Sequence, residues 1–217
     1  MESITIYAYP VAKPSPSLER RHRELLPERW EQLCRYPEHS RQHSLIGDLL
    51  ALHAYHTVYP TDVFPPTQSV TAHGKPYFPA RPDFHYSISH SGDWVACAVG
   101  TMPLGVDIQE ERPVRPAVFR ALSLAEQAYL STLDPSARFS AFFDIWCLKE
   151  AYTKAIGLGL QAGFRDFSVS PKPDISVSGF SVALPHFIDD RYHLGICAQM
   201  IPIPGTQLHI LKEAELL

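Results

Sequence analysis

Residues 142–160 read FFDIWCLKEAYTKAIGLGL and predict the helix around which the chain folds. Aromatic residues recur in this segment at three- and four-residue spacing, which is the period of a helix that buries one stripe of its surface. Glu150 lies four residues after Trp146 and four before Lys154, so a carboxylate and an ammonium continue the line of the indole along the helix. Taken alone, this acid and this cation also describe an ordinary solvated pair worth about 0.3–0.5 kcal/mol.

A second segment, LGVDIQ at residues 104–109, favours a functional interpretation. Its apolar and polar residues alternate, which is the pattern of a strand with one apolar and one polar face. Asp107 and Gln109 then point to the same side, about 7 Å apart along the strand. Two oxygen donors from a strand and the Glu150 carboxylate from a helix suit Mg²⁺, which binds few carboxylates and keeps positions for phosphate oxygens. The alternative is a half-exposed strand with a polar outer face.

Upstream of these segments the chain carries further motifs. GKPYFP at 74–79 is followed by FHYSISHSGDWVACAV at 84–99, and both are preceded by PERWEQLCRY at 27–36 and HSLIGDLL at 43–50. Together with GVDIQ and WCLKEAYTK, this series resembles the 4′-phosphopantetheinyl transferases of the monomeric surfactin-synthetase type. The signatures of that family read approximately G-[IV]-D-x-E and W-x-x-K-E-[AS]-x-x-K. The resemblance covers nearly the whole chain in order, which makes four motifs of moderate specificity a strong signal.

The resemblance implies a fold and a reaction. The fold is α+β, with two similar subdomains related by a pseudo-twofold axis and the active site in the cleft between them. The reaction is Mg²⁺-dependent transfer of 4′-phosphopantetheine from coenzyme A to a serine of an acyl or peptidyl carrier protein, with release of 3′,5′-ADP. By phosphoryl-transfer logic the catalytic residues are Asp107, Glu150 and Lys154, and the metal ligands are Asp107, Gln109 and Glu150.

Coenzyme A carries phosphates that need cations and hydrogen-bond donors. By resemblance, Lys75 and the backbone of Gly74 flank the adenine, and Ser89 with His90 meets the 3′-phosphate. Two further candidates for binding coenzyme A are Lys149 and Arg29, the latter near the position of a family lysine. For His90 the alternative is a histidine that is bonded to its own loop.

Gln109 is a departure from the family pattern, because bacterial members typically carry an acid at this position. An amide oxygen can still bind Mg²⁺ directly or through water, but it adds a dipole instead of a charge. We expect weaker metal affinity and retained activity. Glu111 has the same strand parity and is an alternative ligand, although Pro113 makes any continuation of the strand short.

The two halves of the chain also resemble each other. Each of the following residues has a similar or identical residue 97 positions later: Arg41, Leu45, Ile46, Ala54 and Tyr55 match Arg138, Phe142, Phe143, Ala151 and Tyr152, and Lys75-Pro76 matches Lys172-Pro173. A shared offset favours duplication of an α+β unit. We expect an N-terminal subdomain at 1–102, on the adenine and 3′-phosphate side, and a C-terminal subdomain at 103–217 that carries the metal and the catalytic helix.

Composition limits the remaining possibilities. The chain has 217 residues, a net charge of −4 and four widely spaced cysteines. It has no apolar run near twenty residues and no basic footprint, so we expect no membrane span and no nucleic-acid partner. Cysteines in apolar segments without a C-x-x-C pair fit a reducing cytoplasm. A monomer is expected, because both halves of the cleft lie in one chain.

Residues 110–123, EERPVRPAVFRALS, are the candidate docking surface for a carrier protein. Arginines alternate there with apolar side chains, which suits an acidic, partly apolar partner helix. The same pattern also describes a surface helix whose apolar side packs on its own domain. Two other functions use the same residues: a metal-dependent nucleotide hydrolase, and a non-catalytic binder of coenzyme A or a carrier protein.

Overall fold

The structure is a computed structural model that describes residues 3–11, 13–158, 163–169, 176–177, 179–187, 189–199 and 205–216. In chain order its elements are β1 (Thr5–Pro10), α1 (Pro16–Leu25), α2 (Pro27–Leu33), α3 (Glu38–Val58), β2 (Ser69–Val70), β3 (Pro76–Tyr77), β4 (His85–Ser91), β5 (Trp94–Gly100), β6 (Leu104–Glu110), the 3-10 helix η1 (Pro116–Ala121), α4 (Leu124–Ser131), α5 (Pro135–Ile156), β7 (Ser176–Val177), β8 (Phe180–Ala183), β9 (Tyr192–Ala198), β10 (Gln207–Ile210) and α6 (Glu213–Leu216).

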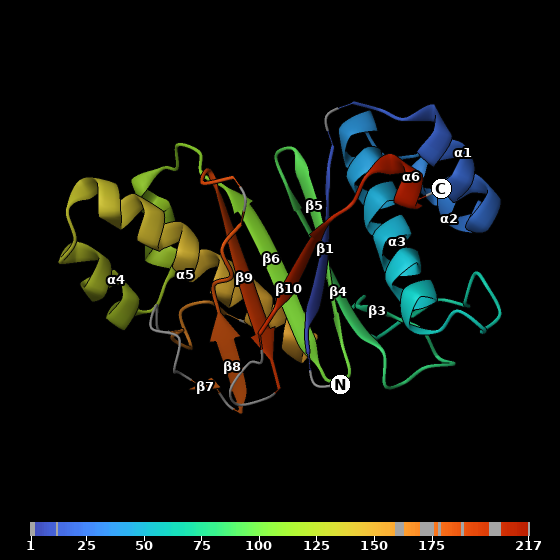
Figure 1. Cartoon of the computed structure of the whole chain (residues 1–217). Helices are drawn as coiled ribbons and strands as arrows, with labels where there is room; N and C mark the ends of the chain where they lie inside the picture. Colours follow the sequence, from blue (N-terminus) through green and yellow to red (C-terminus); the bar gives the residue numbers. More distant parts are fainter. Residues whose placement is uncertain are drawn as a thin grey trace.

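Two four-stranded sheets lie between two long helices (Figure 1). The first sheet has the strand order β10-β1-β5-β4 and the second has the order β6-β9-β8-β7. Helix α3 packs on the outer side of the first sheet, and α5 packs on β6 and β9 of the second. Apolar side chains of both sheets, such as Ile6 and Val106, form a common core between them. The fold is α+β, as the sequence predicted.

The two halves have the same element order. The series β1, α3, β4, β5 corresponds to β6, α5, β8, β9, and the last strand of each series lies between the other two. The residues that the repeat aligned on the two helices are buried, apart from the partly exposed arginines: Leu45, Ile46, Ala54 and Tyr55 in α3, and Phe142, Phe143, Ala151 and Tyr152 in α5. This agreement supports the predicted duplication, while the pseudo-twofold axis stays a prediction. Lys172-Pro173 lies outside the described residues.

The last part of the chain returns to the first sheet. Strand β10 pairs in parallel with β1, and α6 packs on α3. The Ser15 hydroxyl donates to Glu213 Oε1 at 2.8 Å, which ties the start of α1 to α6. Residues 207–216 therefore pack with the N-terminal half, although they follow the expected boundary near residue 102 by more than a hundred positions.

Helix α5 has well-defined ends that explain its length. Asp134 caps its first turn by accepting from the N–H groups of Ser136 and Ala137, and Pro135 occupies the first helical position, where no N–H donor is needed. Gly157 ends the helix with φ 74°, a left-handed conformation that favours glycine. The helix therefore runs from Pro135 to Ile156, which confirms the helix predicted from the aromatic spacing.

Serine side chains connect the two sheets where β4 meets β6. The hydroxyls of Ser87, Ser89 and Ser91 accept hydrogen bonds from the N–H groups of Val106, Ile108 and Glu110 at 3.1, 3.3 and 3.0 Å. Among the described strands, β6 pairs with β9 alone, so alternate N–H groups on its other edge need acceptors. Serines at every second position of β4 supply them, because side chains at this spacing point to one side of a strand.

Two glycines let α5 approach the second sheet closely. A Cβ on Gly105 would collide with the backbone of Ala151 and lie 2.6 Å from the nitrogen of Ala155. A Cβ on Gly195 would lie 2.8 Å from the carbonyl carbon of Cys147. Since these neighbours are backbone atoms, no side-chain rotation relieves the contact. The close approach brings the side chains of α5 to the polar face of β6.

Replacing Gly105 by Ala is expected to destabilise the protein by about 1–3 kcal/mol, because the added methyl pushes α5 away from β6. Urea unfolding of the variant measures this loss. Gly205→Ala is the matched control, because a Cβ at Gly205 meets no atom within 4 Å. Equal unfolding midpoints for Gly105→Ala and the wild type would contradict the close packing of α5.

Candidate functional site

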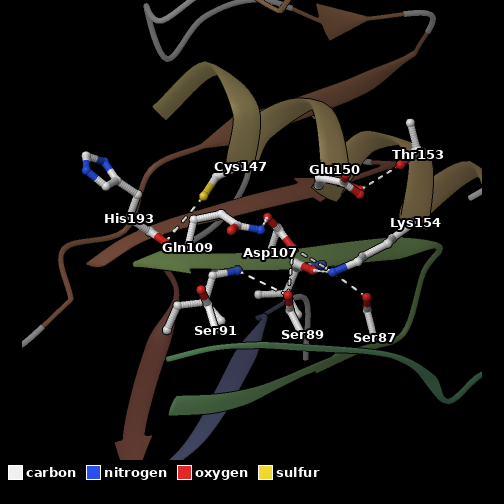
Figure 2. Close-up of polar contacts among 12 residues, drawn as sticks. Ser87, Ser89, Ser91, Asp107, Gln109, Cys147, Glu150, Thr153, Lys154 and His193 are labelled. Carbon is white, nitrogen blue, oxygen red and sulfur yellow. Dashed lines mark hydrogen bonds and ion pairs between the residues drawn. The ribbon is translucent and has the colours of Figure 1, made fainter. Parts of the chain in front are cut away.

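The carboxylate of Asp107 lies at the centre of a polar cluster between β4, β6 and α5 (Figure 2). Asp107 is only 2% exposed. Its Oδ1 accepts from the Ser89 hydroxyl at 2.6 Å and from Lys154 Nζ at 2.7 Å, and its Oδ2 accepts from Gln109 Nε2 at 3.0 Å. A buried carboxylate is stable only when it is paired and hydrogen-bonded, and these three donors meet that need.

Lys154 reaches this carboxylate from the last turn of α5. Its ammonium also donates to the carbonyl of Val106 at 3.0 Å, so it contacts two consecutive residues of β6. About a quarter of the Lys154 side chain remains exposed, whereas Asp107 is enclosed. The cation therefore lies at the border between the buried carboxylate and the solvent, where a charged ligand can reach it.

Glu150 lies one helical turn before Lys154 on α5 and is half-buried. Burial raises the pKa of its carboxyl group, the charge of Asp107 raises it further, and Lys154 opposes the shift. No hydrogen bond joins the Glu150 carboxylate to another side chain in the part of the chain that the structure describes. A carboxylate of raised pKa with free oxygen atoms can accept a proton or bind a cation.

A cavity of about 850 Å³ opens on the N-terminal side of this cluster. Its walls come from α2, α3, β4 and the segment before β3, and they include Arg29, Ser44, Asp48, Gly74 and His90. Arg29 Nε donates to Asp48 Oδ2 at 3.1 Å, so part of its charge is neutralised. The volume lies within the range of cavities that hold small molecules and cofactors.

His90 lies in the wall of this cavity and stacks on His43, with ring centroids 4.7 Å apart. Desolvation, followed by the charges of His43, Lys154 and His39, lowers the pKa of His90 to about 4. The ring is therefore neutral near pH 7 when no ligand is present. A bound anion would favour its protonation, because an opposite charge stabilises the imidazolium.

A smaller cavity of about 190 Å³ adjoins the large one and shares Gly74, Pro76 and Ile88 with it. Lys154 and Gly157 form its opposite wall. The loop around Gly74 therefore contacts both cavities, and the end of α5 closes the smaller one.

Comparison with known proteins identifies the family. The family described as the 4′-phosphopantetheinyl transferase superfamily matches residues 103–198. A 4′-phosphopantetheinyl transferase of Bacillus subtilis is 36% identical over 178 residues, which are 76% of this chain and 78% of the relative. The 4′-phosphopantetheinyl transferase Sfp of B. subtilis strain 168 is 32% identical over 184 residues, or 79% of this chain and 81% of the relative.

The chain belongs to the 4′-phosphopantetheinyl transferase superfamily. It is therefore an enzyme of the transferase class, and the family predicted from the motifs is confirmed. The psf-1 transferase of Bacillus pumilus is a further relative, 29% identical over 77% of this chain and 75% of its own length. No helix in the described part of the transferase is both long and apolar enough to cross a membrane.

The structure brings most of the expected site residues of this transferase together. Gln109, Lys154 and Ser89 contact Asp107 (Figure 2). Glu150 lies one turn before Lys154, where burial, followed by the charge of Asp107, raises its pKa. The remaining candidates for binding coenzyme A divide into three groups. Arg29, Gly74 and His90 line the large cavity, Lys75 lines the smaller one, and Lys149 lines neither.

Lys149 requires a correction, because its ammonium points into the C-terminal core. Its side chain is 0% exposed and forms an ion pair of 2.9 Å with Glu126. It also donates to the carbonyls of Phe164 and Phe167 at 2.8 and 2.5 Å. These contacts use all three protons of the ammonium, so none remains for coenzyme A. Lys149 instead connects α5 to α4 and to the segment around residues 164–167.

Ser89, which the resemblance places at the 3′-phosphate, lies beside Asp107 and is in the lining of neither cavity. Its hydroxyl has one proton, which it donates to Asp107, and it accepts the N–H of Ile108 at 3.3 Å. The hydroxyl therefore orients the central carboxylate and, in this arrangement, has no proton left for a phosphate.

Glu111, the alternative metal ligand, lies beyond the end of β6 and is bound elsewhere. His193 contacts Glu111 Oε1 with Nε2 at 2.8 Å and Asp144 Oδ1 with Nδ1 at 2.6 Å. Burial by itself lowers the pKa of His193, but the hydrogen bonds to Asp144 and Glu111 and the charges of these two carboxylates together raise it. Glu111 is thus paired with His193 instead of joining the group around Asp107. Sequence reasoning missed this cluster, because its three members are far apart in the chain.

The donors around Asp107 fit a hard divalent cation. A carboxylate offers about four lone-pair positions, and Asp107 uses three of them for Ser89, Lys154 and Gln109. The Gln109 amide turns its Nε2 toward Asp107, which leaves its Oε1 as an oxygen donor. Among the described residues, no group of three acidic, histidine or cysteine side chains is arranged to hold a metal ion, so Asp107, Gln109 and Glu150 would supply only a partial shell. Such a shell suits Mg²⁺, which retains water and binds phosphate oxygens.

Replacing Lys149 by Met is expected to lower the free energy of unfolding by about 3–5 kcal/mol, because Glu126 is left buried without its partner. Urea unfolding measures the loss. The double variant Lys149→Met/Glu126→Gln should recover part of it, since no charge then remains buried. A raised KM for coenzyme A with unchanged stability would instead support the ligand role that the resemblance implied.

Proposed function

We propose that this transferase moves the 4′-phosphopantetheine group from coenzyme A to a serine hydroxyl of an acyl or peptidyl carrier protein. The Asp107–Lys154 ion pair with Glu150 beside it, at the edge of a cavity of about 850 Å³, is the observation that carries the proposal. Relatives named 4′-phosphopantetheinyl transferase support the same reaction class. We expect the transferase to act as a monomer in the cytoplasm.

Coenzyme A would occupy the large cavity. Arg29 and His90 supply the positive and protonatable groups that a phosphate needs, and the backbone at Gly74 leaves room for a flat base. Because Arg29 is held by Asp48, its guanidinium is already oriented before the ligand arrives. Such pre-ordering reduces the entropy lost on binding.

Mg²⁺ would be held by Asp107 and Glu150, with the Gln109 amide oxygen as a weak or water-mediated ligand. When bound, it neutralises charge on the diphosphate of coenzyme A. The ammonium of Lys154, in contact with Asp107, would add a second positive charge. The protein thus contributes position and charge, which provide most of the catalysis in phosphoryl transfer.

In the proposed reaction Glu150 accepts the proton of the serine hydroxyl. The serine oxygen of the carrier protein forms a bond to the phosphorus that carries pantetheine, and the bond from this phosphorus to the leaving 3′,5′-ADP breaks. The serine proton passes to Glu150, a half-buried carboxylate beside the Asp107–Lys154 pair. Lys154 stabilises the negative charge that develops on the phosphate oxygens.

The first test combines the protein with coenzyme A, Mg²⁺ and an apo carrier protein and measures the intact mass of the carrier. We expect an increment of ~340 Da, which corresponds to one phosphopantetheine group transferred to serine. EDTA should abolish it. Glu150→Gln should slow transfer by about 10²–10⁴-fold, because it removes the proton acceptor.

Glu24→Gln, an exposed substitution on α1, is the matched control and should retain full transfer. Wild-type rates in Glu150→Gln would remove Glu150 from the mechanism. Binding of coenzyme A without any increment on several carriers would favour a non-catalytic binder. Hydrolysis of coenzyme A without a carrier would favour a hydrolase.

The carrier protein would dock on residues 110–123. In this segment Val114, Val118 and Phe119 pack against the core around α5, so the apolar side faces its own domain. The arginines remain exposed: Arg112, Arg115 and Arg120. Leu124, which follows directly at the start of α4, is 77% exposed. The surface therefore offers positive charge with one apolar anchor, which suits an acidic partner helix.

Replacing Arg115 and Arg120 by Glu is expected to raise the KM for the carrier protein about tenfold or more, because like charges then meet at the interface. The KM for coenzyme A should not change, since the cavity lies on other elements. The same charge reversal at Arg20 and Arg23, two exposed residues of α1, is the control. An unchanged carrier KM in the first variant would place docking elsewhere.

A further inference from the structure

Lys75 joins the loop between β2 and β3 to the second half of the molecule. Its Nζ donates to the carbonyl of Leu104 at 2.8 Å and to the carbonyl of Lys154 at 2.7 Å. No carboxylate pairs with this ammonium among the described residues. Burial lowers the pKa of Lys75 to about 8. The fold therefore places a cation in a partly desolvated position where two main-chain carbonyls compensate for the lost water.

Both carbonyls belong to the elements that build the site. Leu104 begins β6, the strand that carries Asp107. Lys154 lies in the last turn of α5, where main-chain carbonyls have no helical partner and the helix dipole favours a positive charge. The N–H of Gly157 also reaches this carbonyl, at 3.3 Å. Lys75 thus holds the start of the strand and the end of the helix at a fixed distance.

Lys154 is consequently fixed at two points. Its carbonyl accepts from Lys75, and its ammonium donates to Asp107 and to the carbonyl of Val106. A main-chain shift at Lys154 would move the ammonium relative to Asp107. The hydrogen bond from Lys75, which lies in a loop far from Lys154 in the sequence, opposes such a shift.

We propose that Lys75 is a positioning residue that fixes Lys154 at the active site by holding the C-terminal end of α5, and that it is not a ligand of coenzyme A. The predicted effect on kcat rests on the phosphopantetheinyl transfer proposed above. The contact with α5 itself is independent of that function. The same loop contributes Gly74 and Pro76 to the wall of the large cavity, so one lysine connects the coenzyme side to the catalytic cation.

The direction of the side chain separates this role from the one that the resemblance implied. The neighbours Gly74 and Pro76 line the large cavity, whereas Lys75 lines only the smaller one, together with Lys154 and Gly157. Two of the three protons of its ammonium are donated to carbonyls. The resemblance placed Lys75 beside the adenine, where its side chain would line the large cavity.

The test compares wild type, Lys75→Met and Lys75→Arg. Coenzyme A binding is measured by calorimetry, and transfer kinetics are measured with a carrier protein. In Lys75→Met we expect kcat to fall about 10–100-fold, the cost of misplacing a catalytic group by about 1 Å, while the dissociation constant for coenzyme A stays within about threefold. Lys75→Arg should recover part of kcat, since a guanidinium can also donate to two carbonyls. Lys13→Met, an exposed substitution, is the control.

Amide hydrogen exchange gives a readout that does not depend on activity. In Lys75→Met, the amides of the last turn of α5, including Gly157, should exchange at least about tenfold faster, while α3 keeps its protection. If the wild type transfers nothing, the proposed function fails, but this exchange still decides the positioning role. Unchanged exchange at the end of α5, or a weaker coenzyme A affinity with unchanged kcat, would overturn the inference.

Discussion

The burial of one carboxylate, that of Asp107, is the constraint on which the site and much of the fold depend. Removing a carboxylate from water costs several kcal/mol unless donors surround it. Here the donors come from three places: Ser89 on β4, Gln109 on β6, which also carries Asp107, and Lys154 on α5. The two sheets and the C-terminal helix must therefore meet at one point for the charge to be tolerated. Such a junction positions a reactive group between the halves of the molecule without requiring a separate active-site loop.

The approach of α5 shows how packing and chemistry share one helix. Gly105 and Gly195 remove the side chains that would hold the helix away from β6 and β9. Lys149 and Lys154 are five residues apart, which corresponds to about 140° around a helix. One ammonium therefore enters the C-terminal core and pairs with Glu126, while the other reaches Asp107. The motif that contains both lysines thus fixes the position of the helix and supplies the cation of the site.

Much of this arrangement was predictable from periodicity. The alternation in LGVDIQ predicted a strand with Asp107 and Gln109 on one side, and the spacing of Trp146, Glu150 and Lys154 predicted their common line on α5. The same spacing already placed Lys149 off that line, on another side of the helix. Its burial could therefore have been predicted, but the motif resemblance favoured a role in binding coenzyme A. Three features had no local signal: the contact of Lys75 with α5, the use of the Ser89 proton by Asp107, and the return of β10 to β1. Each depends on which elements meet in three dimensions.

The neutral amide of Gln109 also limits the negative charge around Asp107. Its Nε2 donates to Asp107, which a glutamate at this position would not do. A glutamate would also add a third negative charge near Asp107 and Glu150, where Lys154 is the cation in contact. The neutral side chain therefore stabilises the metal-free site, and it offers a divalent cation less attraction than an acid would. Burial, followed by the charge of Asp107, already raises the pKa of Glu150 here. In the proposed reaction, an amide as the third oxygen donor would keep the site ordered before the metal and coenzyme A bind, and it would bind the metal more weakly than an acid.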